Sequence, residues 1–272
     1  MPKKAVLTEY SLSVSKLKIP LDLALVSDIH ERKSDDILEL LKKSKPDLIL
    51  IAGDTFERYY DEESETKPKK NVFISVVKET AYYANYLLMR VFGKNNRADT
   101  AATYRFLAEA AKLAPVFISL GNHDMKLSED DLAVLHGNGI ILLDNSDARA
   151  AVRGVDINIG GLSYSPDESR LEEFSKKQGF KLLLCHAPEY YDTMIAEKDI
   201  DLTLAGHNHG GQFKLFGKGV LSSRSGFFPK YDSGVFHNRM VVSAGCSNTI
   251  ALPRWNNPRE LVIIHLKPKK EP

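Results

Sequence analysis

Residues 21–30, LDLALVSDIH, place a short and mainly apolar run directly before a serine, an aspartate and a histidine. The run 21–26 has the length and composition of a strand that is buried on both faces. Asp28 and His30 lie two positions apart, so in an extended chain both side chains point to the same side and can hold one ion. One such pair is weak support for a metal site, because the spacing is common.

Four later stretches repeat the same order of apolar run and polar cluster. They are LILIAGD at 48–54, VFISLGNHD at 116–124, FKLLLCH at 180–186 and LTLAGHNH at 202–209. In open sheets flanked by helices, ligands bind beyond the carboxyl ends of the strands, so five strand ends can bring distant side chains to one place. Oxygen and imidazole ligands meeting there are what a two-metal hydrolytic site needs. The candidate metal ligands are Asp28, His30, Asp54, Asn122, His186, His207 and His209.

Each cluster also has an ordinary interpretation when it is taken alone. Asp54 follows Gly53, whose missing side chain lets the backbone turn sharply beside an ion, but an Asp there is more often a turn or helix-cap residue. His186 alone is more often a hydrogen-bonded histidine at a strand end than a ligand. Cys185 is better explained as a small buried hydrophobe than as a thiolate ligand. Five clusters in one chain make the metal site the stronger interpretation.

The tetrapeptide Gly121-Asn122-His123-Asp124 is the most specific cluster. Asn122 offers a neutral oxygen to a hard cation. His123 can be held protonated by the charge of the adjacent Asp124 and can then donate a proton to a phosphate oxygen or a leaving group. An ordinary Gly-Asn turn with an exposed histidine is the alternative for this cluster alone.

Composition bounds the class of protein. The chain has 272 residues, of which 43% are hydrophobic and 27% charged, as in one large globular domain or a domain with an insertion. The formal net charge of +1 gives no global field for nucleic acid or an anionic membrane, although a local patch stays open. Cys185 and Cys246 have no C-x-x-C spacing, the first residues contain no apolar leader, and no run of 18 apolar residues occurs. We expect a cytoplasmic protein without disulfides or a transmembrane segment, and peripheral membrane association stays open.

Strand-like and helix-like segments alternate over the first two thirds of the chain, and the last third is rich in strand-like segments, which predicts an α/β fold with stacked sheets. Helical patterns cover 34–43, 128–136 and 167–177. A charged stretch at 61–70 precedes a longer helical pattern at 72–92 with an aromatic face, and a second pattern at 101–113 returns the chain to the sheet. We therefore expect a helical insertion at 58–100. It is a hairpin packed on the domain edge, or else a cap over the site, a partner surface or an oligomer contact.

Taken in order, the five clusters resemble the pattern of the calcineurin-like metallophosphoesterases, D-x-H, G-D, G-N-H-[DE], H and G-H-x-H. The resemblance covers residues 21 to about 266 apart from the insertion. GHNHGGQ at 206–212, KYDSGVF at 230–236 and RWNNPRE at 254–260 are similar to a narrower branch, the YkuE/YaeI-type phosphodiesterases. Asn208 differs from the Thr or Ser that the family usually has between the last two histidines.

The resemblance implies a fold and a ligand set. The fold is a four-layer α-β-β-α sandwich of two stacked mixed sheets flanked by helices, formed by a single domain over residues 1–272. His123 would be the general acid, with Asp124 as its orienting partner. Mixed oxygen and imidazole ligation favours Mn²⁺, Fe or Zn²⁺ for the two divalent ions. One ion would be held by Asp28, His30, Asp54 and His209, and the other by Asp54, Asn122, His186 and His207.

The activity implied is hydrolysis of a phosphodiester or pyrophosphate bond by a hydroxide that bridges the two metals. The substrate would be a small-molecule or a lipid-linked phosphoester. A broad phosphomonoesterase is the alternative within enzymes, and a non-catalytic binding module of the same fold is the alternative from another class. Such a module would be expected to lack His123 or a ligand. Nucleic acid is a weaker substrate candidate, because no basic stripe interleaved with aromatic residues borders the motifs.

Overall fold

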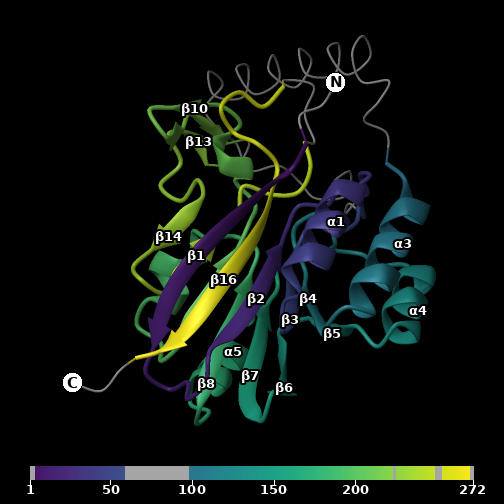
Figure 1. Cartoon of the computed structure of the whole chain (residues 1–272). Coiled ribbons are helices and arrows are strands. Elements are labelled where there is room, and N and C mark those ends of the chain that lie inside the picture. The colour runs from purple at the N-terminus through teal and green to yellow at the C-terminus, as the bar shows by residue number, and fades with distance from the viewer. Residues whose placement is uncertain (1–3, 59–97, 223–224, 249–252, 270–272) are drawn as a thin grey trace, which may run out of the picture.

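Two six-stranded sheets form the centre of the molecule in the computed structural model, which describes residues 4–58, 98–222, 225–248 and 253–269 (Figure 1). In the first sheet β2, β3, β4 and β5 are parallel, and β16 lies antiparallel to β2 and parallel to β1. The first sheet is therefore mixed. Its order is β1 (Val6–Val14), β16 (Glu260–Pro268), β2 (Leu21–Val26), β3 (Leu48–Ala52), β4 (Val116–Ser119) and β5 (Ile141–Leu143).

The second sheet has a similar plan. Its four middle strands are parallel, and both edge strands pair antiparallel to their neighbours. The order is β14 (Gly234–Phe236), β15 (Met240–Val242), β9 (Leu202–Ala205), β8 (Phe180–Cys185), β7 (Val155–Leu162) and β6 (Ser146–Val152). The strands β2, β3, β4, β8 and β9 are the five apolar runs that the sequence predicted.

Alternate residues of β2 enter two different cores, which explains why the predicted strands are apolar throughout. Leu23 and Leu25 pack between the two sheets, whereas Ala24 and Val26 face a second core under the helices. That second core lies beneath α1 (Asp35–Ser44), α3 (Thr100–Ala111) and α4 (Glu129–Gly137), which cover one side of the first sheet (Figure 1). A third core lies between the second sheet and α5 (Glu168–Ser175) with the helical turn Tyr191–Ile195. The expected α-β-β-α order of layers is confirmed.

Helix starts follow the local sequence. Ser128 caps α4 in a capping box with Asp131, and the side chains of Asp99 and Asp167 cap α3 and α5. Ser34 precedes α1 but makes no side-chain cap. The helical patterns predicted at 34–43, 101–113, 128–136 and 167–177 are confirmed within a few residues. The predicted linker 61–70 and the helix 72–92 lie outside the described residues.

Two short hairpins follow β9. The helical turn His209–Gly211 leads into β10 (Lys214–Leu215) and β11 (Lys218–Gly219), and then into β12 (Leu221–Ser222) and β13 (Gly226–Phe227). Among the described residues, no helix is both long enough and apolar enough to span a bilayer.

Candidate metal centre

The predicted ligands follow the carboxyl ends of five strands of both sheets. Asp28 and His30 come after β2, Asp54 after β3, and Asn122 after β4. His186 follows β8, and His207 and His209 follow β9. The two sheets meet here, because the His186 Nδ1 atom of the second sheet lies 2.7 Å from the Ala52 carbonyl oxygen of the first.

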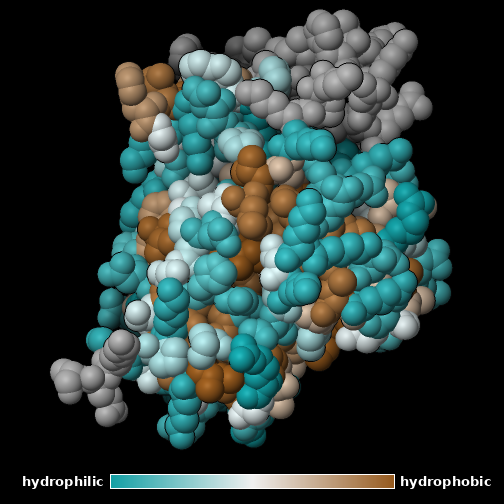
Figure 2. Space-filling model, in the orientation of Figure 1, coloured by the Kyte–Doolittle hydropathy of each residue, from teal (hydrophilic) through white to brown (hydrophobic). Residues whose placement is uncertain are grey.

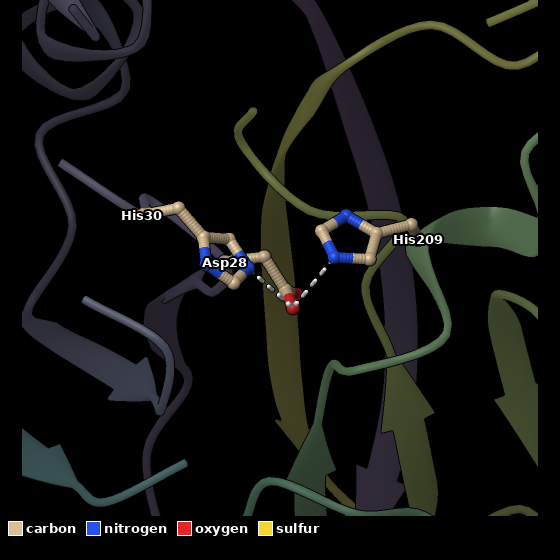
Figure 3. Close-up of side chains that lie close together, drawn as sticks. All are labelled: Asp28, His30 and His209. Carbon is tan, nitrogen blue, oxygen red and sulfur yellow. Dashed lines mark ion pairs between the residues drawn. The ribbon is translucent and has the colours of Figure 1, made fainter. Parts of the chain in front are cut away.

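One group of ligand atoms belongs to Asp28, His30 and His209, and these atoms lie within 4.8 Å of one another. Figure 3 shows both imidazole rings pointing toward the Asp28 carboxylate from opposite sides. The Nε2 atoms of His30 and His209 are 3.8 Å and 3.6 Å from Asp28 Oδ1. These three side chains could therefore hold one ion together.

A second group consists of Asp54, His186 and His207. His186 Nε2 lies 3.1 Å from Asp54 Oδ2, and His207 Nδ1 lies 3.0 Å from His186 Nε2. Asp54 Oδ2 is also 3.4 Å from His30 Nε2, which belongs to the first group. The Asp54 carboxylate thus stands between the two groups, where a carboxylate that bridges two ions is needed.

Strained backbone positions hold these ligands. Five of the seven candidates have a positive φ, namely Asp28 (56°), His30 (51°), Asp54 (53°), His207 (73°) and His209 (47°). Such conformations persist only where the surrounding structure enforces them, and they cluster at functional sites. The extended arrangement expected for Asp28 and His30 is therefore wrong. Their side chains converge because the backbone turns, with the N–H groups of Asp28 and His30 donating to the carbonyl oxygens of Gly53 and Asp54.

Two glycines let the loops approach each other. Gly53 has a φ of 80°, and a Cβ atom there would lie 2.7 Å from His186 Nδ1. A Cβ atom on Gly121 would lie 2.1 Å from Asp54 Oδ1. The role expected for Gly53, a sharp turn beside the site, agrees with this geometry.

Opposite charges balance inside the site. Burial raises the pKa of Asp54, but the opposing effect of His186 and His30 is larger, so the pKa falls below its usual value and the carboxyl is ionised. Burial also raises the pKa of Asp28, but His209 and His30 hold it well below its usual value. Burial lowers the pKa of His30, but Asp54 and Asp28 raise it to about 10. Buried carboxylates that attract protons onto neighbouring imidazoles will also attract cations.

Burial and the adjacent His186 lower the pKa of His207 to about 3. Burial likewise lowers the pKa of His209 to about 3, with Asp28 opposing the shift. Both rings are therefore neutral at ordinary pH, which is the form that binds metals. Burial lowers the pKa of His186, but Asp54 and Asp28 raise it to about 9. The site accordingly offers ionised carboxylates and the neutral rings of His207 and His209 to a cation, which would displace a proton from His30 and from His186 as it binds.

The donor set fits divalent metal ions. The Asn122 Oδ1 atom is buried and has no hydrogen-bond partner among the residues that the structure describes, which is costly for an oxygen that binds nothing. His186 donates its Nδ1 hydrogen to the Ala52 carbonyl oxygen, so Nε2, which faces Asp54 and His207, is the nitrogen that could coordinate an ion, as is usual for metal-bound histidines. Carboxylate, amide and imidazole ligands together suit the borderline metals better than an all-oxygen cage for Mg²⁺ or Ca²⁺.

His123 stands beside this ligand set. Its backbone N–H donates to Asp54 Oδ1 at 2.8 Å, and its ring packs edge-to-face on His30 with centroids 4.4 Å apart. Its side chain is 19% exposed, whereas the His30 side chain is 1% exposed. A bound molecule can therefore reach the His123 ring.

Glu57 is a site residue that the sequence analysis missed. Its Oε2 atom lies 3.0 Å from His123 Nδ1, and its Oε1 atom lies 3.2 Å from His30 Nδ1. One carboxylate thus contacts the proposed proton donor and a metal-ligand candidate. A signal was present, since Glu57 lies three positions after Asp54 in the same loop.

The Asp124 carboxylate contacts backbone N–H groups, whereas the sequence led us to expect that it orients the His123 ring. Its carboxylate accepts hydrogen bonds from the backbone N–H groups of Phe56 (2.8 Å), Gly121 (3.0 Å) and Thr55 (3.3 Å). Burial and the charge of Asp54 raise the pKa of Asp124 to about 6. Asp124 therefore ties the loop after β3 to the loop after β4, and Glu57 is the carboxylate at the His123 ring.

Arg254 was also missed as a neighbour of the site. Its Nη2 atom lies 3.1 Å from His209 Nδ1, and its guanidinium donates to the carbonyl oxygens of Ala244 and Ser247. Burial lowers its pKa to about 10, although Asp28 opposes the shift. Arg254 begins the segment 254–260, whose sequence is similar to that of the YkuE/YaeI-type branch.

An α-β-β-α sandwich with two ligand groups joined by one aspartate defines a class, the hydrolases built for two metal ions. The sequence profile of the Calcineurin-like phosphoesterase family matches residues 21–211, and the chain belongs to this family. The family is one of metal-dependent phosphoric ester hydrolases, and the predicted superfamily is thereby confirmed. The narrower YkuE/YaeI-type branch stays a prediction.

Relatives are distant. The chain is 27% identical over 216 residues to the uncharacterized protein YpbG of Bacillus subtilis strain 168, covering 77% of this chain and 68% of YpbG. It is also 27% identical over 268 residues to the uncharacterized metallophosphoesterase Cj0846 of Campylobacter jejuni, covering 94% of this chain and 60% of that protein. A solved structure of Yfce, a phosphoesterase from E. coli, aligns with 89% of this chain and 87% of its own, at 13% identity and a TM-score of 0.43.

Proposed function

We propose that this protein hydrolyses a phosphodiester or pyrophosphate bond with the help of two divalent ions, Mn²⁺, Fe or Zn²⁺. The observation that carries the proposal is the position of Asp54, whose Oδ2 atom lies 3.4 Å from His30 Nε2 and 3.1 Å from His186 Nε2. When bound, two such ions neutralise charge on a phosphoryl group and make water a hydrolytic nucleophile at neutral pH. Asp28, His30, Asp54 and His209 would hold one ion, and Asp54, Asn122, His186 and His207 the other.

His123 would supply the proton for the leaving oxygen. Glu57 Oε2 faces His123 Nδ1, which places the hydrogen of that nitrogen toward the carboxylate and stabilises a positively charged ring. The other ring nitrogen, Nε2, lies 3.9 Å from Asp54 Oδ2, on the side of the ligand groups. A proton on Nε2 can pass from there to an oxygen of a substrate held in the site.

The finer points of the substrate are part of the proposal. A proton donor contributes most where the leaving group is a poor one, such as the alkoxide of a diester. The same alkoxide leaves from a diester and from an alkyl monoester, so the proton donor fits both. We place a small-molecule or lipid-linked diester first because of the sequence resemblance to the phosphodiesterase branch, and a broad monoesterase is the alternative. A non-catalytic binding module has no support, because all seven ligand candidates and His123 are present. A cytoplasmic location stays a prediction.

The test compares two activated substrates on the same protein. Metal-free protein is resupplied with Mn²⁺, Fe²⁺ or Zn²⁺, and kcat/KM is measured for bis-p-nitrophenyl phosphate and for p-nitrophenyl phosphate. We expect no turnover without metal and a higher kcat/KM for the diester with at least one of the ions. A higher value for the monoester would favour the phosphomonoesterase. Absence of hydrolysis with every metal, in protein shown to bind metal, would favour the binding module.

A further inference from the structure

Exposed aromatic side chains gather on the two hairpins that follow the metal-ligand loop. Phe216 is 98% exposed, Phe227 76% and Phe228 67%. Trp255, 55% exposed, joins them because its backbone pairs with Phe213 and accepts a hydrogen bond from the Lys214 N–H. We call Leu215, Phe216, Phe227, Phe228 and Trp255 the aromatic corner. Figure 2 shows apolar atoms projecting beside β10 and β13.

The backbone at this corner is strained under the same aromatic residues. Phe216 and Gly217 form the turn between β10 and β11 with φ values of 50° and 79°, and Phe228 has a φ of 53°. A two-residue hairpin turn with two positive φ values strongly prefers Asn-Gly, and a bulky residue there is an outlier. Phe216 gains almost no burial in return. Arg153 and Gly154 form the same kind of turn between β6 and β7, with φ values of 49° and 78°, so the backbone alone does not single out Phe216. Phe216 differs from Arg153 because the side chain that it exposes is large and apolar.

The hairpins also carry a local positive charge. Residues 213–230 contain Lys214, Lys218, Arg224 and Lys230 and no Asp or Glu, although the whole chain has a net charge of only +1. Lys230 pairs with Asp192 at 2.7 Å, and the Lys214 ammonium donates to the Ser233 hydroxyl. Arg224 lies outside the described residues. Carboxylates from outside this segment also face the hairpins, since Glu189 accepts from the Ser225 hydroxyl and Asp232 from the Gly219 N–H. Among the described residues, Lys214 and Lys218 therefore supply the positive charge beside the aromatic side chains, which suits a membrane surface that contains anionic lipids.

The aromatic corner and the metal centre are built on the same loops. The turn His209–Gly211 ends two residues before β10, and the Val220 N–H donates to the Gly211 carbonyl oxygen at 3.1 Å. Trp255 directly follows Arg254, whose guanidinium lies 3.1 Å from His209 Nδ1. The aromatic corner is therefore connected to the loop of His209 by short chain segments and by these hydrogen bonds.

We propose that the aromatic corner docks this protein on an anionic lipid surface. Phe216, Phe227 and Phe228 enter the interfacial layer, where aromatic side chains are favoured, and the lysines face the headgroups. Side chains that project from hairpin tips suit a deformable bilayer better than the groove of a folded partner. The docked protein would act on a phosphoester carried by a lipid, and this last clause rests on the proposed function.

Trp255 makes the docking measurable without an activity assay, because it is the only tryptophan of the chain. The full-length protein is titrated with vesicles of phosphatidylcholine and phosphatidylserine and, separately, of phosphatidylcholine alone. Tryptophan emission and co-sedimentation are recorded at low and high salt. We expect a blue shift and co-sedimentation with the anionic vesicles, both weakened by salt because the lysine contribution is screened.

Variants of the corner separate docking from folding. Phe216→Asn suits the turn better than phenylalanine, so the Tm should stay or rise, while vesicle affinity should fall about tenfold, as expected for losing one buried aromatic side chain. Ile141→Asn, at a half-exposed apolar residue on β5, is the matched control and should leave binding unchanged. Lys218→Gln should weaken binding about fivefold. Lys176, at the end of α5, has a side chain that is 70% exposed, and Lys176→Gln should leave vesicle binding unchanged.

Several results would overturn the docking proposal. One is the absence of binding to anionic vesicles, and another is vesicle binding by Phe216→Asn that equals that of the unsubstituted protein. A third is a corner variant that converts a dimer to a monomer in sedimentation, which would make the corner a contact between copies. His123→Asn keeps the docking proposal distinguishable from the proposed function, since it should bind vesicles as the unsubstituted protein does. Vesicle binding without any hydrolysis would contradict the proposed function alone. Hydrolysis of a soluble diester without vesicle binding would contradict docking alone.

Discussion

The metal centre and the aromatic corner both reverse the usual distribution of side chains. Asp28, Asp54 and His186 are charged or polar and almost completely buried, whereas Phe216, a few residues beyond the last ligand, is almost completely exposed. Folded proteins normally bury phenylalanine and expose aspartate. Both regions also hold residues other than glycine at positive φ. Positive φ alone marks neither region, because Lys45 and Arg153 adopt it as well. What the two regions share is strained backbone together with reversed burial, and we propose that one contacts an ion and the other a surface.

The largest expected effect is the loss of metal from the Asp54→Asn variant. Asp54 lies between both ligand groups, so its replacement removes a charge shared by two cations. Removing one partner from a buried charge cluster costs about 3–5 kcal/mol, which corresponds to a fall of roughly 10²–10⁴-fold in metal affinity. His30→Asn is the matched control, because it alters mainly one group. Metal content per chain should be lower in Asp54→Asn, and two ions retained in that variant would remove the bridging assignment.

The next effect concerns chemistry without binding. His123→Asn should lower kcat by roughly 10²–10⁴-fold while metal content stays the same, since the ring donates a proton and is not counted among the ligands. Metal analysis and steady-state kinetics on the same preparation decide this. A rise in KM at constant kcat would indicate uniform substrate binding instead. Loss of metal would make His123 a ligand, and the site would then be larger than the seven candidates.

A smaller effect distinguishes the two carboxylates near His123. Glu57→Gln should lower kcat by about 10–100-fold and alter the pH profile, because Glu57 orients the ring and stabilises its charge. Glu57→Asp should restore part of the activity.

Asp124→Asn is the matched partner in this test. It should mainly lower the free energy of unfolding, by about 1–3 kcal/mol, because Asp124 accepts three backbone N–H groups. Urea unfolding and a pH–rate profile of both variants give the answer. An altered pH profile in Asp124→Asn alone would return the orienting role to Asp124.

Much of the fold and of the ligand set can be predicted from sequence, for a physical reason. Strands that enter a core on each face must be apolar at every position, so residues 21–26 or 48–52 are conspicuous. Polar residues at the ends of such strands can only meet at one edge of the sheets. The positions of Asp28, Asp54 and His186 follow from these two constraints without knowledge of any contact.

Other features depend on long-range contacts and cannot be read in the same way. Asp124 is adjacent to His123 in sequence, yet the carboxylate at the ring comes from Glu57, 66 positions away. The convergence of Asp28 and His30 requires left-handed backbone that no local pattern predicts. Phenylalanine is usually buried when it lies in a strand. Phe216 and Phe227 are exposed because they lie in short hairpins at the surface. Adjacency in sequence is thus a poor guide to partners within loops.

The smallest expected effect is that of replacing His265, which belongs to a partly exposed polar pair. It serves as the reference for the effects expected at the buried ligands. His265 on β16 lies opposite Asp22 on β2, with its Nδ1 atom 2.7 Å from Asp22 Oδ1 and its Nε2 atom 3.2 Å from Glu9 Oε1. The hydrogen bond to Asp22 raises the pKa of His265 against the opposing effect of partial burial. Its stabilising contribution is therefore complete below the unfolded pKa of about 6.5 and is lost as the pH rises through the folded pKa.

His265→Asn should accordingly lower the free energy of unfolding by a few tenths to about 1 kcal/mol at about pH 5.5 and by less at about pH 9, as for other partly exposed ion pairs. Urea unfolding of the two proteins at both pH values measures the difference, and contributions from the other titrating groups cancel between them. A loss of several kcal/mol, or one that grows with pH, would show that an exposed pair can matter as much as the buried ligands. The contrast between ordinary and reversed burial would then no longer mark the functional regions of this chain.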